Sequence, residues 1–85
     1  MKVLIPSALR SYTESSRADV CGATLAEALA DLERQYPGIR FRMINEQDGV
    51  RRHIRIFING EQVYALSQPL TEADEVVIVQ ALSGG

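Results

Sequence analysis

The sequence has very little of the chemistry that enzymes use. Cysteine and histidine occur once each among the 85 residues, as Cys21 and His53. A single cysteine cannot close an internal disulfide, so the fold does not depend on an oxidising compartment, and we expect a cytoplasmic protein. No nucleophile lies at a recognisable spacing from a base, and no glycine-rich phosphate loop is present. We therefore expect neither a catalytic site nor a metal site nor a bound cofactor on this chain.

Charge and hydrophobicity argue against further classes. The formal net charge is −2, whereas a general nucleic-acid-binding protein usually has a basic surplus. No apolar run approaches the length of a membrane span. The length fits one small domain, and 46% apolar with 24% charged residues is ordinary for a soluble globular protein. The sequence does contain a local basic cluster, formed by Arg51, Arg52 and Arg55.

Periodicity and turn residues predict the elements of secondary structure. Alternating or branched apolar residues predict strands over residues 2–5, 18–21, 53–58, 62–65 and 75–81. The polar stretch 7–17 is predicted to be a loop, and residues 67–74 a connection with room for one helical turn. Asn59-Gly60 is the strongest short signal for a β-hairpin.

One helix is strongly indicated. Thr24 suits its N-cap, and Glu27 three residues later completes a capping box. Pro37-Gly38 ends it. Between them, apolar residues recur at helical spacing: Leu25, Ala28, Leu29, Leu32 and Tyr36. The segment 39–52 stays open, because its apolar residues suit either a loop or a short helical turn.

These elements predict an α+β domain. The last strand is apolar on both faces and therefore belongs at the centre of a sheet. The helix covers one side of that sheet and supplies the crossover that makes the first and last strands parallel neighbours. Cys21 is expected to pack as a small apolar residue, and His53 to be a solvated or edge residue.

The chain ends in Gly84-Gly85. Because glycine has no Cβ, such a tail can lie in a channel too narrow for side chains and present a bare main-chain carboxylate. The alternative is a terminus that simply frays. We expect a body over residues 1–82 and a flexible tail over 83–85.

Four segments together resemble the bacterial sulfur-carrier proteins of the MoaD and ThiS type, which have the β-grasp, or ubiquitin-like, fold. They are Lys2-Val3-Leu4-Ile5-Pro6, Thr24-Leu25-Ala26-Glu27-Ala28-Leu29, Ile56-Phe57-Ile58-Asn59-Gly60-Glu61, and Asp74-Glu75-Val76-Val77-Ile78 with the Gly-Gly end. The lead-in to the third strand, 51–56, looks most like carriers that serve cysteine or thio-metabolite synthesis. The family's usual aspartate-glycine-aspartate is here Glu72-Ala73-Asp74.

This resemblance implies a carrier and not an enzyme. Gly85 would be the point of sulfur attachment, first adenylated by an E1-like adenylyltransferase/sulfurtransferase and then converted to a thiocarboxylate. Leu82, Ser83 and Gly84 would be read by the partner's channel. ATP would bind the partner. A sulfur-accepting synthase and a metalloprotease that releases a product are the other partners implied, with no nucleic acid and no membrane.

Strand alternation points to a docking surface. If Ile54, Ile56 and Ile58 face the helix, the intervening residues face away from it. The residues predicted to form this partner-binding surface are Leu4, Phe57, Val77 and Val79, with Arg55 beside them. The alternatives are coverage by residues 39–50 or by a second copy. The arginine cluster either steers a partner or protects a sheet edge.

Three functions stay open from the residues. They are a sulfur carrier, a ubiquitin-like modifier conjugated through Gly85, and a non-covalent β-grasp interaction module. The pathway that receives the sulfur and the oligomeric state are not encoded in a recognisable motif.

Overall fold

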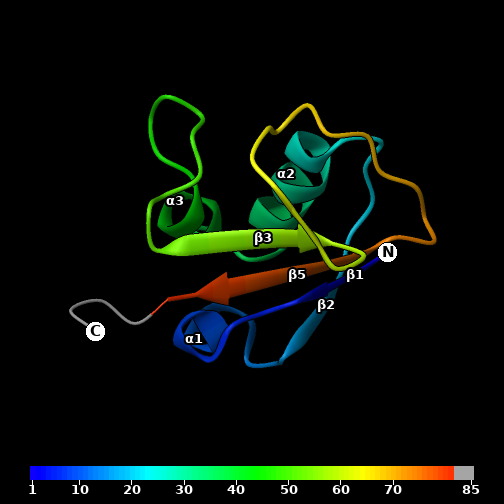
Figure 1. The fold of residues 1–85 in the computed structure, drawn as a ribbon. Helices are drawn as coiled ribbons and strands as arrows, with labels where there is room; N and C mark the ends of the chain where they lie inside the picture. Colours follow the sequence, from blue (N-terminus) through cyan, green and yellow to red (C-terminus); the bar gives the residue numbers. More distant parts are fainter. Residues whose placement is uncertain (82–85) are drawn as a thin grey trace.

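The structure is a computed structural model that describes residues 1–81. Its strands are β1 (Lys2–Leu4), β2 (Arg17–Asp19), β3 (Ile54–Ile58), β4 (Glu61–Val63) and β5 (Glu75–Gln80). Its helical segments are the 3-10 helix η1 (Ser7–Leu9) and the α-helices α1 (Arg10–Thr13), α2 (Leu25–Gln35) and α3 (Ile39–Met43). The strands form one mixed sheet in the order β2-β1-β5-β3-β4 (Figure 1). The predicted α+β fold class is confirmed.

Strand β5 lies at the centre of this sheet. It runs parallel to β1, with Val3 opposite Val76, and antiparallel to β3, with Ile56 opposite Ile78. All four of these side chains are buried on the side that carries α2 and α3. The central, parallel placement of the first and last strands is therefore as predicted, and it leaves β5 fixed by hydrogen bonds along both edges.

Helix α2 begins at the predicted cap. The Thr24 hydroxyl oxygen accepts a hydrogen bond from the Glu27 N–H at 3.2 Å, and the Glu27 carboxylate accepts one from the Ala23 N–H at 3.1 Å. The second bond of the box thus falls one residue earlier than the standard pattern, and both satisfy N–H groups near the helix start. The buried face of the helix is formed by Leu25, Ala28, Leu29 and Leu32.

The open segment 39–52 contributes to the same core. Ile39, Met43 and Ile44 are fully buried with the α2 stripe, and Figure 1 shows α3 on the α2 side of the sheet. The Asn45 side chain accepts hydrogen bonds from the N–H groups of Gln47 and Gly49, both at 2.9 Å, which closes the turn. The alternative in which this segment covers the opposite face is therefore wrong.

The predicted β-hairpin turn at Asn59-Gly60 is confirmed, and Asn59 also makes tertiary hydrogen bonds. Asn59 and Gly60 both have positive φ, 51° and 89°, as a two-residue hairpin turn of type I′ requires. The Asn59 amide also donates to the Asp74 carboxylate at 2.8 Å, and its oxygen accepts from the Glu75 N–H at 3.0 Å. The turn after β3 is thereby tied to the start of β5.

Several local predictions were wrong. Residues 7–17 are not a loop, because they contain η1 and α1 and bury Leu9; elements of three and four residues are too short to show a period. Strand β2 begins one residue before the predicted range and ends two residues short of it, and β4 likewise starts one residue early and ends two short. The connection 67–74 contains turns and no helix. Cys21 is exposed and not packed, because Val20 takes the inward position after β2.

Candidate functional site

The described chain leaves the sheet beside the start of β3. Strand β5 ends at Gln80, and the Ala81 N–H donates to the His53 carbonyl at 2.7 Å. This bond fixes the point from which the C-terminal residues depart. The predicted sulfur-attachment residue Gly85 and the predicted recognition residues Leu82, Ser83 and Gly84 lie outside the described residues.

The five side chains predicted for partner binding come together on the sheet face opposite α2 and α3. Leu4 lies opposite Val77, and Val77 lies opposite Phe57, so these three form one row across β1, β5 and β3. Arg55 lies opposite Val79 in the next row. We call Leu4, Phe57, Val77 and Val79 the open-face patch.

The open-face patch is partly exposed to solvent. Val79 is 41% exposed, and the other three side chains are half-buried, whereas the alternate residues of β5, Val76 and Ile78, are buried. The alternation predicted from the sequence is therefore present in β5. Whether a partner covers the patch remains a prediction.

Arg55 has a role within the chain. Its guanidinium donates to the carbonyls of Arg52 and, at 3.1 Å, Ile54. Strand β4 pairs only with Ile56–Ile58, so these two carbonyls belong to the stretch before the β4 pairing begins. Arg55 thus satisfies backbone groups at a partly open sheet edge, which supports the edge-protecting alternative for this arginine.

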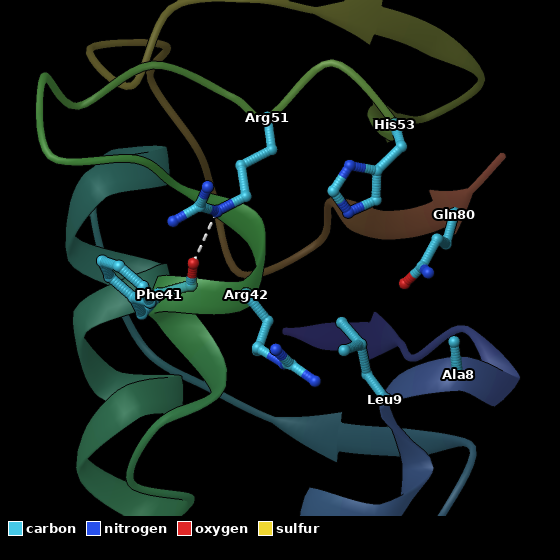
Figure 2. Close-up of a pocket in the computed structure, with 7 residues that line it drawn as sticks. All are labelled: Ala8, Leu9, Phe41, Arg42, Arg51, His53 and Gln80. Carbon is cyan, nitrogen blue, oxygen red and sulfur yellow. Dashed lines mark hydrogen bonds between the residues drawn. The ribbon is translucent and has the colours of Figure 1, made fainter. Parts of the chain in front are cut away.

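A groove of about 320 Å³ lies at the same end of β5 (Figure 2). Four separate segments build it: η1, α3, the connection before β3, and the end of β5. We call it the tail-root groove. Its lining residues are Ala8, Leu9, Phe41, Arg42, Arg51, His53 and Gln80.

Arg51 is held in place at the edge of this groove. Its Nε donates to the Phe41 carbonyl at 2.7 Å, and its guanidinium carbon lies 4.6 Å from the centroid of the Phe41 ring. The stack accounts for an otherwise isolated aromatic side chain that is 57% exposed. Sequence reasoning pointed to Arg51 as part of a basic cluster and expected His53 to be a solvated or edge residue. It missed Phe41 and Arg42 as site residues, because the segment that carries them had no assignable structure.

The chain's one thiol lies away from this site. Cys21 follows β2 at the end of the sheet where Val20 bonds to Met1, opposite the end from which β5 leaves. Its N–H donates to the Asp31 carboxylate at 3.0 Å. That bond, with those from Arg34 and Gln35, holds the pKa of Asp31 below its usual value. Among residues 1–81, no group of three or more His, Cys, Asp or Glu side chains is placed to hold a metal ion.

In the same range, no helix is long and apolar enough to cross a bilayer.

A family model, a curated protein and solved structures all match this chain over nearly its full length. The model of the ThiS family matches residues 3–85. The sulfur carrier protein CysO of Mycobacterium tuberculosis is 32% identical over 89 residues, covering 98% of this chain and 96% of that protein. The crystal structure of the Amycolatopsis orientalis BexX/CysO complex contains a chain that is 31% identical, with a TM-score of 0.91 and coverage of 99% and 98%. SAMP1 of Haloferax volcanii is 30% identical, with a TM-score of 0.80 and coverage of 100% and 98%.

Proposed function

This chain belongs to the ThiS family, and from that premise we propose that it is a sulfur carrier whose Gly85 carboxylate is converted to a thiocarboxylate. The observation that carries the proposal is that the family match runs through residues 84 and 85, the Gly-Gly pair itself. The likeness to CysO over nearly the full length supports it.

The chemistry begins with activation of a poor electrophile. A carboxylate resists attack because its charge is delocalised and oxide is a poor leaving group. In the proposed reaction, a carboxylate oxygen of Gly85 attacks the α-phosphorus of ATP on an E1-like partner, and pyrophosphate leaves. Sulfide then attacks the acyl carbon, and AMP leaves with that oxygen. With a persulfide as the donor, a thiol afterwards reduces the acyl disulfide. The product is a thiocarboxylate, ionised at neutral pH and strongly nucleophilic.

The body of the chain has a different task in this proposal, which is presentation. Strand β5 is fixed between β1 and β3 up to Gln80, so the tail departs from a defined position beside the open-face patch. A partner that covers the patch gains about 1.5–3 kcal/mol for each apolar side chain that goes from fully exposed to fully buried. Half-buried side chains contribute correspondingly less. The E1-like enzyme, the sulfur-accepting synthase and a product-releasing metalloprotease are the proposed users of this surface.

A second candidate is a ubiquitin-like modifier joined through Gly85 to an amine of a target protein. It is supported by the similarity to the small archaeal modifier protein SAMP1 of Haloferax volcanii. Both candidates begin with adenylation and differ in the nucleophile that follows. A non-covalent interaction module is the third, and it leaves Gly85 chemically unchanged.

Intact-protein mass spectrometry separates these candidates. The chain is incubated with an E1-like enzyme from its own organism, ATP and sulfide, with and without cell extract. A carrier gains the mass difference between one sulfur and one oxygen atom. A modifier instead appears in conjugates of higher mass in the extract. An unchanged mass in every reaction refutes both covalent functions.

A further inference from the structure

Charged side chains are segregated along β5. At its start, Glu75 lies across from Lys2, which in turn lies across from Asp19, and Glu72 and Asp74 precede it. At its end, Gln80 lies opposite Ile54, which Arg51, Arg52 and His53 precede. The chain as a whole carries a net charge of −2, yet the end from which the tail departs is basic.

The basic groups of the tail-root groove have no acidic partner in the described part of the chain. The ion pairs within residues 1–81 are Met1–Glu72, Arg34–Asp31 and Arg40–Asp48. None of them uses a cation of the groove. The carboxylate of Asp48, in the turn that precedes Arg51 in the chain, is paired with Arg40. Arg42 and Arg51 therefore offer guanidinium groups that no carboxylate of residues 1–81 neutralises.

These groups are arranged around a shared space. Figure 2 shows Arg51 and His53 along one side of the groove, with Arg42 and Leu9 facing them from other segments. Arg51 is already fixed by Phe41, so binding there costs less side-chain entropy. Guanidinium groups recognise carboxylates and phosphates, so the occupant is anionic.

The length of the C-terminal tail distinguishes between two anionic occupants of the groove, the carboxylates of a partner protein and the phosphates of ATP. Gly85 is five residues beyond Gln80, and five extended residues span at most about 16–18 Å. A tail that is fully extended in a partner's channel would place the reacting carboxylate, and the nucleotide beside it, about that far from the groove. The groove then faces the protein around the channel entrance and not the phosphates of ATP.

We propose that the tail-root groove docks onto an acidic surface, rich in Asp and Glu, around the channel entrance of the enzyme that receives the tail. This inference rests on the proposed carrier function. Gln80 lines the groove and Val79 belongs to the open-face patch; they are successive residues on opposite faces of β5, so a partner that surrounds the end of this strand reaches both. The patch supplies apolar contact, while the groove orients the approach and raises the association rate.

The test compares two double variants with equal change in net charge. Arg42→Gln/Arg51→Gln removes two groove cations, and Arg17→Gln/Arg34→Gln removes two cations elsewhere. The measured quantities are kcat and kcat/KM for thiocarboxylate formation with the E1-like enzyme, ATP and sulfide, over a range of salt concentrations. At low salt the groove variant loses about tenfold in kcat/KM with kcat unchanged. The loss shrinks towards 1 M salt, where the Debye length is about 3 Å. The control variant stays within about twofold of wild type, because steering depends on where the cations lie.

The single variant Arg42→Gln controls for misfolding, because it breaks no hydrogen bond found in residues 1–81. It should show a smaller, salt-dependent loss of kcat/KM. Equal kcat/KM and equal salt dependence in wild type and groove variants overturn the groove proposal and leave the carrier function standing. Saturable binding of ATP or inorganic phosphate by the free chain, lost in the Arg42→Gln variant, also overturns it in favour of a phosphate site. A wild-type chain that never gains sulfur refutes the carrier function, and the groove proposal falls with it.

Discussion

The substitution Gly22→Ala should destabilise the fold, because Gly22 packs directly on the backbone of α2. A Cβ at this position would lie 2.5 Å from the Ala28 nitrogen and 2.9 Å from the Glu27 carbonyl carbon. Both atoms belong to the first turns of the helix and cannot rotate away as a side chain does. The added methyl must therefore push the connection between β2 and α2 off the helix.

The magnitude follows from this geometry. Overpacking by a methyl group costs typically about 1–3 kcal/mol. For a domain of this size, each kcal/mol lowers Tm by roughly 4–8 °C, so the expected decrease is about 4–24 °C. Thermal unfolding followed by circular dichroism measures it directly.

Gly60→Ala is the matched control for this experiment. A Cβ there meets nothing within 4 Å, but Gly60 has a φ of 89°, so the loss reports backbone strain alone. A Gly22→Ala variant with wild-type Tm refutes the close packing of the β2–α2 connection on the helix. Below its Tm, the same variant should still be activated normally, since Gly22 lies at the end of the sheet remote from Gln80.

Three further predictions concern the partner surface, the tail and acid stability. Val77→Thr keeps the shape of the side chain but makes the middle of the open-face patch polar. Because Val77 is already half-buried, the variant should bind the partner about 1 kcal/mol more weakly, or with roughly fivefold lower affinity, and its Tm should change little. Equal affinity in a binding titration would place the docking surface elsewhere. Gly85→Ala should abolish activation in the mass assay while the fold is intact, and normal thiocarboxylation would refute a channel that excludes side chains. Hydrogen bonds from the Thr71 N–H and the Asn59 amide hold the pKa of Asp74 below its ordinary value of 3.8. Since the folded-state pKa is the lower one, this stabilisation is present above that ordinary value and is lost as pH falls through the folded pKa. In denaturant titrations from about pH 6 down to about pH 2, Asp74→Asn should lose less stability on acidification than wild type, and identical pH profiles would contradict the assignment.

The elements that the sequence predicted are those whose signal is repeated or chemically specific. Helix α2 has a cap, an apolar stripe and a terminator, and β3 with its Asn59-Gly60 turn has alternation followed by a residue pair suited to positive φ. Strand β5 was placed at the centre because both of its faces are apolar. The residues of the open-face patch were predicted from the same alternation. Once the strand order was also correct, these side chains were expected to lie side by side.

The tail-root groove could not be predicted in this way. It joins side chains from η1, α3, the connection before β3, and β5, which lie up to about seventy residues apart in the chain. Two of these segments are helical turns of three and five residues, too short for a period to be visible. The stack of Arg51 on Phe41 also depends on a tertiary contact, and no spacing between residues 41 and 51 signals it.

The open-face patch and the tail departure have a common structural cause. A central strand with valines on both faces gains most of its stability from the buried face, where Val76 and Ile78 pack under α2 and α3. The isolated domain gains less from the apolar side chains of Val77 and Val79, which stay partly exposed to solvent. Their apolar character is explained if another protein covers them, and the strand that carries them is the one that leads directly into the Gly-Gly end. The hydrogen bonds that hold β5 between β1 and β3 therefore fix the proposed docking surface relative to Gln80, the last residue of the strand.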